Sequence, residues 1–277
     1  MIRFSCHITG EIPLLAVAIH NGHKIRDNIV KYLAIDESTR LREEDPYTAY
    51  YTIVAENRLI INTSRFEVDL NRAREDAVYR MPEQSWGIKV WKDNVPGILW
   101  EESLLEYDFF YRSFDLLIQE FIRKFGYIII YDIHTYNYRR QNPSTEDSPL
   151  QNPEINVGTG SLNLNLWSPV VNYFVKCLAN YNYFQRNLDV RENVRFKGGF
   201  LSQWVHQNYP GRSCVLAIEI KKIFMDEWTG VVDTEKLNKL TQALQVTMPG
   251  VLHLAKQVGL SLPTTKVFWK SYKTGQI

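Results

Sequence analysis

Residues 127–135 read YIIIYDIHT, and this stretch decides the fold. A run of aliphatic and aromatic side chains that ends in polar residues is typical of a strand buried on both faces of a parallel sheet. Similar apolar runs occur at residues 14–19, 58–61 and 215–220. Patterns typical of amphipathic helices separate them, at residues 48–56, 101–125, 169–180 and 233–258. This alternation predicts an α/β fold with a mixed, mostly parallel central sheet covered by helices on both faces.

Composition limits the classes of protein to consider. The chain has 277 residues, of which 45% are hydrophobic and 23% charged, so it can bury a sizeable core, and we expect a single domain over residues 1–277. Lys and Arg number 32 against 31 Asp and Glu, without a basic block, which argues against a nucleic-acid partner. No stretch reaches the roughly 20 apolar residues of a membrane span. Three widely spaced cysteines without a CxxC motif indicate a reducing compartment, so we expect a cytoplasmic protein.

One long segment has the composition of a loop. Residues 136–160 read YNYRRQNPSTEDSPLQNPEINVGTG and are rich in Asn, Pro, Ser and Gly. Loops of this length inside a domain are uncommon and often carry function. We therefore expect an irregular loop here, either a binding loop or plain surface structure.

Polar residues follow several of the predicted strands. His20 follows the first, Asp132 lies at the end of the run at 127–133 and His134 directly follows it, and Glu219 lies at the end of the last. Ligands gather at the carboxyl ends of parallel strands, and catalytic zinc takes three protein N or O ligands and a water. The third ligand would come from Glu43, Glu44 or Asp45. Acidic residues at a helix N-terminus explain that triplet equally well.

A second group of polar residues lies in FEVDLNRAREDAVY, residues 66–79. Apolar side chains at alternate positions indicate an extended segment that delivers Asn71, Arg72 and Arg74 into a turn. An arginine fork with an adjacent amide can bind a carboxylate of the substrate. The alternative is a solvated turn in which Asp69 pairs with the arginines.

Taken together, these motifs resemble the N-formylglutamate amidohydrolase family, which is similar in fold to zinc carboxypeptidases (a zinc exopeptidase-like fold) and to succinylglutamate desuccinylase and aspartoacylase. The resemblance runs from about residue 14 to residue 230. The motifs that carry it are HNG (20–22), EEDPYT (43–48), SRFEVDLNRAR (64–74), YDIHT (131–135), FKGGF (196–200) and AIEIKKIFMDE (217–227).

The resemblance implies roles for particular residues. His20 and His134 would bind zinc with Asp45 or Glu44, of which Asp45 fits the family pattern better. Asn71 and Arg72 would bind the substrate carboxylate with Arg74 in support, and Glu219 would be the general base. The sequence departs from the HxxE motif of the carboxypeptidases, because His23 stands at that position, so His23 is a further candidate ligand. The arginine that follows the glutamate strand in many members is Lys221 or Lys222 here.

The expected function is therefore that of a zinc-dependent amidohydrolase with one divalent ion per chain. It would cleave the amide of an N-acyl amino acid such as N-formylglutamate, a small-molecule substrate. One alternative is a zinc carboxypeptidase-like peptidase or deacylase that acts on a short peptide. Another is a non-catalytic module of the same fold that binds a carboxylate or a partner protein.

Overall fold

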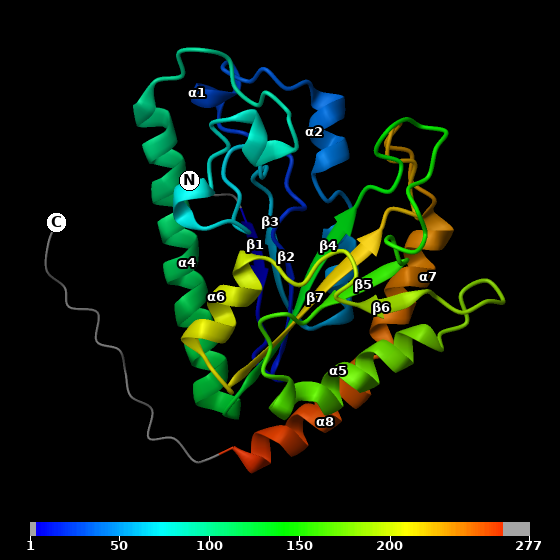
Figure 1. Ribbon diagram of the computed structural model, residues 1–277. Helices are drawn as coiled ribbons and strands as arrows, with labels where there is room; N and C mark the ends of the chain where they lie inside the picture. The colour runs from blue at the N-terminus through cyan, green and yellow to red at the C-terminus, as the bar shows by residue number, and fades with distance from the viewer. Residues whose placement is uncertain (1–3, 263–277) are drawn as a thin grey trace, which may run out of the picture.

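A seven-stranded mixed sheet forms the centre of the computed structural model, which describes residues 4–262 (Figure 1). The strand order is β1-β3-β2-β4-β7-β5-β6. Strands β3, β2, β4 and β7 are parallel neighbours, β1 is antiparallel to β3, and β5 is antiparallel to β7. The strands are β1 (Phe4–His7), β2 (Leu14–Ala18), β3 (Asn57–Ile61), β4 (Ile128–Tyr136), β5 (Ile155–Gly158), β6 (Val190–Glu192) and β7 (Ser213–Lys221).

Helices cover both faces of this sheet. One core lies under α4 and α6, and another under α3, α5, α7 and α8 (Figure 1). The helices are α1 (Asp27–Val30), α2 (Glu37–Glu43), α3 (Thr48–Tyr51), α4 (Gly97–Phe125), α5 (Leu164–Ala179), α6 (Phe200–Asn208), α7 (Thr234–Gln245) and α8 (Met248–Ser261). The predicted fold class is confirmed.

The central strands explain why the sheet is buried so completely. All nine residues of β4 and all five of β2 are buried, because helices cover both of their faces. Along β4, Ile128 and Ile130 face the core under α4 and α6, whereas Ile129 and Tyr131 face the opposite core. Asp132 and His134 continue the first of these alternating sets. Both therefore lie on the α4 and α6 face, near the carboxyl end of the strand.

Two predictions about the elements are wrong in part. The irregular segment expected over 136–160 ends earlier, since β5 (Ile155–Gly158) is a fully buried strand paired with β7. The helix expected over 233–258 is two helices, α7 and α8, because Pro249 lacks an amide hydrogen and lies in the first turn of α8. Between residues 4 and 262, no helix combines the length and the apolar character that crossing a bilayer requires.

Candidate metal centre

Three of the predicted ligands converge near the carboxyl ends of the central strands. His20 follows β2, Asp45 lies between α2 and α3, and His134 is in β4. One potential ligand atom from each lies within 4.8 Å of the others, and all three residues are buried. Asp45 Oδ2 is 3.1 Å from His134 Nδ1 and 3.4 Å from His20 Nδ1. Two imidazoles and one carboxylate form a donor set that suits zinc, without a thiolate.

The outer nitrogen of each imidazole is held by its own buried carboxylate. His20 Nε2 donates to Asp69 Oδ1 at 2.7 Å, and His134 Nε2 donates to Asp132 Oδ1 at 2.9 Å. These bonds fix the tautomer and leave each Nδ1 as the atom that faces the shared centre. Carboxylates that orient metal-binding histidines in this way are a common feature of zinc sites.

Charge concentrates at this centre. Burial by itself raises the pKa of Asp45, but hydrogen bonds from His134 and His20 outweigh it and lower that pKa. Burial also lowers the pKa of His134, yet the charge of Asp132 and the hydrogen bonds to Asp132 and Asp45 raise it well above its usual range. The site thus holds several buried carboxylates around two imidazoles, an arrangement that favours a cation at its centre.

The HNG motif explains how His20 is positioned. Asp45 N donates to the carbonyl of His20, which ties the segment before α3 to the end of β2. Asn21 Oδ1 accepts a hydrogen bond from Ala49 N in the first turn of α3. A Cβ on Gly22 would lie 2.3 Å from the carbonyl carbon of Asn62, so only glycine allows the close approach of the two segments.

The neighbouring candidates Glu44 and His23 lie apart from the three-residue cluster. Glu44 accepts hydrogen bonds from the Ser64 hydroxyl and from His23 Nδ1, and His23 is partly exposed. Lys222 Nζ donates to the backbone carbonyl of Glu44 at 2.8 Å, so this lysine stabilises the backbone next to Asp45. Asp45 is thus the carboxylate that lies in the cluster, whereas the Glu44 carboxylate is bound to His23 and Ser64.

Glu219 lies beside His134 in the sheet. The two residues are paired in the parallel register of β4 and β7, so their side chains are neighbours on the same face. Glu219 is also the one residue of β7 that is not fully buried. Burial raises the pKa of its carboxyl to about 7, while the nearby His134 opposes that shift. A carboxyl group with this pKa can exchange a proton near neutral pH.

The turn at residues 69–72 is held from several sides. Asn71 N donates to Asp69 Oδ1, and Asn71 Oδ1 accepts from Leu201 N in the first turn of α6. From α4, Tyr111 donates to the carbonyl of Leu70 at 2.6 Å and Tyr107 donates to that of Arg72 at 2.9 Å. Asp69 thus connects the turn directly to His20 in the cluster.

The two arginines of the predicted clamp differ in their surroundings. Arg72 is exposed, and it forms no ion pair within residues 4–262. Arg74 is bound through two nitrogens to the carboxylate of Asp108 on α4, at 2.7 and 2.9 Å. Within the described residues, Arg74 therefore has an ion-pair partner on the protein surface and Arg72 has none.

Two residues near the centre are missing from the sequence-based site. Arg65 donates to Asp69 Oδ2 at 2.8 Å and stacks on the Trp86 ring, and the Tyr79 hydroxyl donates to the same oxygen. Burial by itself lowers the pKa of Arg65, but Asp69, Tyr79 and Asp45 raise it well above its usual value. Both residues flank the DLNR motif, but no spacing rule for a turn pairs them with Asp69.

The chain is similar to known proteins in sequence and in fold. The model of the N-formylglutamate amidohydrolase family matches residues 12–225. The structure of N-formylglutamate amidohydrolase from Ralstonia eutropha JMP134 is similar to this chain, with a TM-score of 0.72 and 16% sequence identity. That similarity covers 94% of this chain and 99% of the other.

A gene product of Agrobacterium tumefaciens has a similar structure, with a TM-score of 0.61 and 14% identity over 92% of this chain and 96% of that one. No curated protein sequence matches the chain significantly. The two structural similarities support the fold, and the family match spans most of the sequence. The chain therefore belongs to the N-formylglutamate amidohydrolase family and is a hydrolase that acts on an amide bond.

Proposed function

We propose that this protein is a zinc-dependent amidohydrolase that removes the acyl group, with formyl as the first candidate, from an N-acyl amino acid such as N-formylglutamate. The observation that carries the proposal is the convergence of His20, Asp45 and His134, with a separate buried carboxylate behind each imidazole. A purely structural histidine pair has no need of this arrangement. Family membership supports the reaction class.

The residues present fit one zinc ion. His20 and His134 offer Nδ1, Asp45 offers a carboxylate oxygen, and these atoms lie within 4.8 Å of one another. Zinc binds such N and O donors readily. A bound zinc ion supplies Lewis acidity, which polarises a carbonyl group and makes water more acidic. Asp69 and Asp132 keep both rings oriented for this role.

Glu219 is the proposed general base. It would accept a proton from the attacking water and pass it to the departing amine as the amide bond breaks. Its pKa of about 7 suits both transfers, because the carboxyl group can be charged in one step and neutral in the next. The Glu219 side chain is partly exposed near the carboxyl end of β7, so a substrate can reach it.

Asn71 and Arg72 are proposed to bind the carboxylate of the amino acid. Arg72 is exposed without an ion pair in the described chain, and the Asn71 side-chain oxygen already accepts from Leu201, so its amide hydrogens remain for a ligand. Arg74 is left out of the proposed clamp because Asp108 holds its guanidinium.

The test combines metal analysis with a substrate panel. The purified protein should contain about one zinc ion per chain and hydrolyse N-formylglutamate, with N-acetyl and N-succinyl amino acids and a short peptide as competitors. Glu219→Gln should lower kcat by about 10²- to 10⁴-fold and retain the zinc. The control is Glu146→Gln, which changes an exposed carboxylate in the loop before β5.

Several results would contradict the proposal. Full activity in Glu219→Gln would remove Glu219 as the base. If the protein contained no bound metal and chelators left its activity unchanged, zinc would be ruled out as a cofactor. Preference for the peptide over every acyl amino acid would replace the deacylase with a peptidase.

A further inference from the structure

The solvent side of α4 carries four large apolar side chains. Ile98 is 65% exposed, Leu105 64%, Phe109 44% and Leu116 57%. At about 100° per residue, their spacings of seven, four and seven place them within about 40° of one another around the helix. They form one stripe, which we call the α4 stripe. The residues that α4 buries against the sheet, such as Tyr107 and Phe114, lie on the opposite side.

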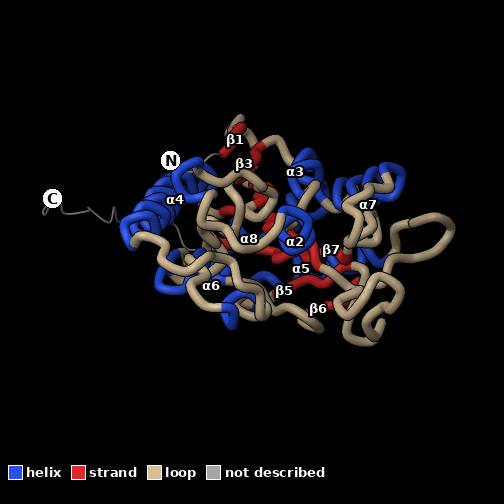
Figure 2. The backbone as a smooth tube through the Cα atoms, turned by 90° about the horizontal axis from the view of Figure 1, so that it is seen from above, coloured by secondary structure: helices blue, strands red, loops and turns tan. Residues whose placement is uncertain are grey.

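No described element covers this stripe. In Figures 1 and 2, α4 lies at the margin of the fold, with the sheet on its inner side. A surface helix is ordinarily polar on the face that points to solvent. A line of exposed apolar residues on such a helix indicates an interaction site.

The α4 stripe is symmetric about Tyr107. Ile98 and Leu116 lie nine residues before and after it, and Leu105 and Phe109 lie two residues before and after it. The two remaining positions with the same heptad-like spacing, five residues to either side, are Glu102 and Arg112. Each residue therefore has a partner of matching chemistry at the mirrored position, apolar with apolar and acidic with basic.

We propose that a second copy of this chain docks on the α4 stripe, with the two α4 helices antiparallel about a twofold axis that crosses the helix at the level of Tyr107. Ile98 would then contact Leu116 of the partner subunit, and Leu105 would contact Phe109 of the partner subunit. Such a self-complementary surface is what a twofold homodimer requires. When Glu102 and Arg112 are counted with the stripe, the spacings alternate between four and three residues, as in helices that pack side by side.

Charge favours this arrangement over its alternatives. In the antiparallel register Glu102 faces Arg112 of the partner subunit. Arg112 is exposed and forms no ion pair within residues 4–262, whereas the Glu102 carboxylate forms an ion pair with Arg26 at 2.7 Å and is still 39% exposed. Parallel helices would instead bring like charges together at both positions, which is destabilising.

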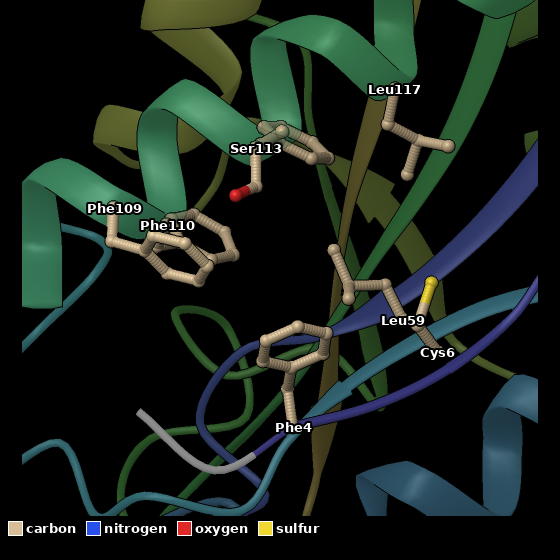
Figure 3. Close-up of a pocket in the computed structure, with 8 residues that line it drawn as sticks. Phe4, Cys6, Leu59, Phe109, Phe110, Ser113 and Leu117 are labelled. Carbon is tan, nitrogen blue, oxygen red and sulfur yellow. The ribbon is translucent and has the colours of Figure 1, made fainter. Parts of the chain in front are cut away.

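A groove beside the stripe extends the apolar surface. It has a volume of about 220 Å³ and lies between α4 and the edge strand β1 (Figure 3). Phe109 and Phe110 line it from α4, and Phe4 and Leu59 line it from the sheet. Because Phe109 belongs to both, the apolar surface that a second copy would cover continues from the stripe to β1.

The register can be tested by cysteine cross-linking of two single variants. Cys6→Ser and Cys177→Ser first remove the accessible native thiols, and Cys214 is buried. Ile98→Cys and Leu116→Cys are then made in separate proteins. Mild oxidation should cross-link an equimolar mixture and leave each protein alone unlinked, because the two copies of either site would be about 27 Å apart along the helices.

The matched control mixes Ile98→Cys with Glu146→Cys, an exposed site outside the stripe, and should yield no cross-link above background. Cross-links that form within each protein alone would indicate a parallel arrangement and overturn the proposal. Equal yields in the control mixture would show random collision, which would also overturn it.

The strength of the dimer is tested by sedimentation of the full-length protein over a range of concentrations. The 32.5 kDa chain should sediment as a dimer, and Leu105→Lys with Phe109→Lys should raise its dissociation constant at least about 100-fold, since each lysine enters the contact twice. The control Leu260→Lys changes an exposed leucine on α8 and should have no effect. A monomer at every concentration, whether the stripe is bare or covered by residues 263–277, would refute the proposal, as would a dimer that the lysines leave intact.

Discussion

The carboxylate behind each imidazole sets how well the cluster can hold a metal. Asp132 accepts from His134 Nε2 and also from the Ser202 hydroxyl, so it is fixed from two sides. Asp132→Asn keeps the shape and removes the charge that makes the ring a stronger ligand. We expect the affinity for zinc to fall by about 10- to 100-fold, measured by competition with a chromogenic chelator.

The control for this variant is Asp93→Asn, which changes an exposed carboxylate paired with Lys89. Its zinc affinity should match that of the wild type. Equal affinity in Asp132→Asn would mean that Asp132 only supports the fold around α6.

His206 gives the fold a dependence on pH that is separate from the metal centre. Burial lowers its pKa to about 4, and its Nε2 accepts a hydrogen bond from Val215 N in β7. Protonation would place a hydrogen on Nε2 against that amide. The unfolded chain takes up the proton near the ordinary value of 6.5, so stability is complete above this pH and decreases as the pH falls toward 4.

Urea unfolding at pH 7 and pH 4.5 measures this contribution. His206→Gln can keep a side-chain acceptor for Val215 N but cannot titrate, so it should lose less stability between the two pH values than the wild type does. Identical losses would assign the acid sensitivity to other groups.

Some residues of the candidate site could be recognised in the sequence, and others could not. His20 and His134 were predictable because each directly follows or ends an apolar strand. Which of Asp45 and Glu44 lies in the cluster could not be predicted, because adjacent residues share the same sequence context and yet have different partners in the fold. Arg65 and Tyr79 were missed because the spacing of residues between 65 and 79 does not indicate which side chains meet Asp69 after folding.

At the scale of elements, α4 supports the turn that carries Asn71 and Arg72. Tyr111→Phe removes the hydrogen bond to the carbonyl of Leu70 and leaves that buried oxygen without its donor. The turn should then be held less firmly, so KM should rise about fivefold, the effect of roughly 1 kcal/mol, while kcat changes little. Steady-state kinetics with the best acyl amino acid measure both constants.

The matched control is Tyr209→Phe. Tyr209 also bonds to α4, at Asp115, but lies away from the turn. A similar rise of KM in both variants would indicate a general loosening of α4 instead of a specific role for Tyr111.

Most central strands were predictable, and the strand β5 beside them was not. Apolar runs identified β2, β3, β4 and β7, because strands buried on both faces have a distinctive composition. The strand β5 was not predicted, because it is short and includes the polar residue Asn156. That side chain is satisfied by the backbone of residues 194–196, which is a long-range contact that local sequence does not reveal.

At the scale of the whole molecule, the proposed metal joins the ends of two strands and the segment between α2 and α3. Zinc removal should therefore destabilise the entire fold, since the buried carboxylates lose the charge that balances them. Saturating zinc at about 100 times its dissociation constant contributes about 2.7 kcal/mol, which corresponds to a rise in Tm of at least about 5 °C.

Thermal unfolding with a chelator, and again after zinc is restored, measures this difference. The control is His20→Ala, in which zinc should leave Tm nearly unchanged. A wild-type Tm that is indifferent to the chelator would argue against a stably bound ion.

The side chains of Glu44 and Asp45 have different partners, and this limits which mutations the segment around them can accept during evolution. Lys222 Nζ donates hydrogen bonds to the carbonyls of Arg42 and Glu44, so the number of residues between these carbonyls and Asp45 is constrained. Loss of a single residue there would bring the longer Glu44 side chain to the place of Asp45 and pull those carbonyls from the lysine. Apart from Asp45 itself, we expect positions between His20 and Thr48 to accept substitutions far more often than the segment next to Asp45 accepts insertions or deletions.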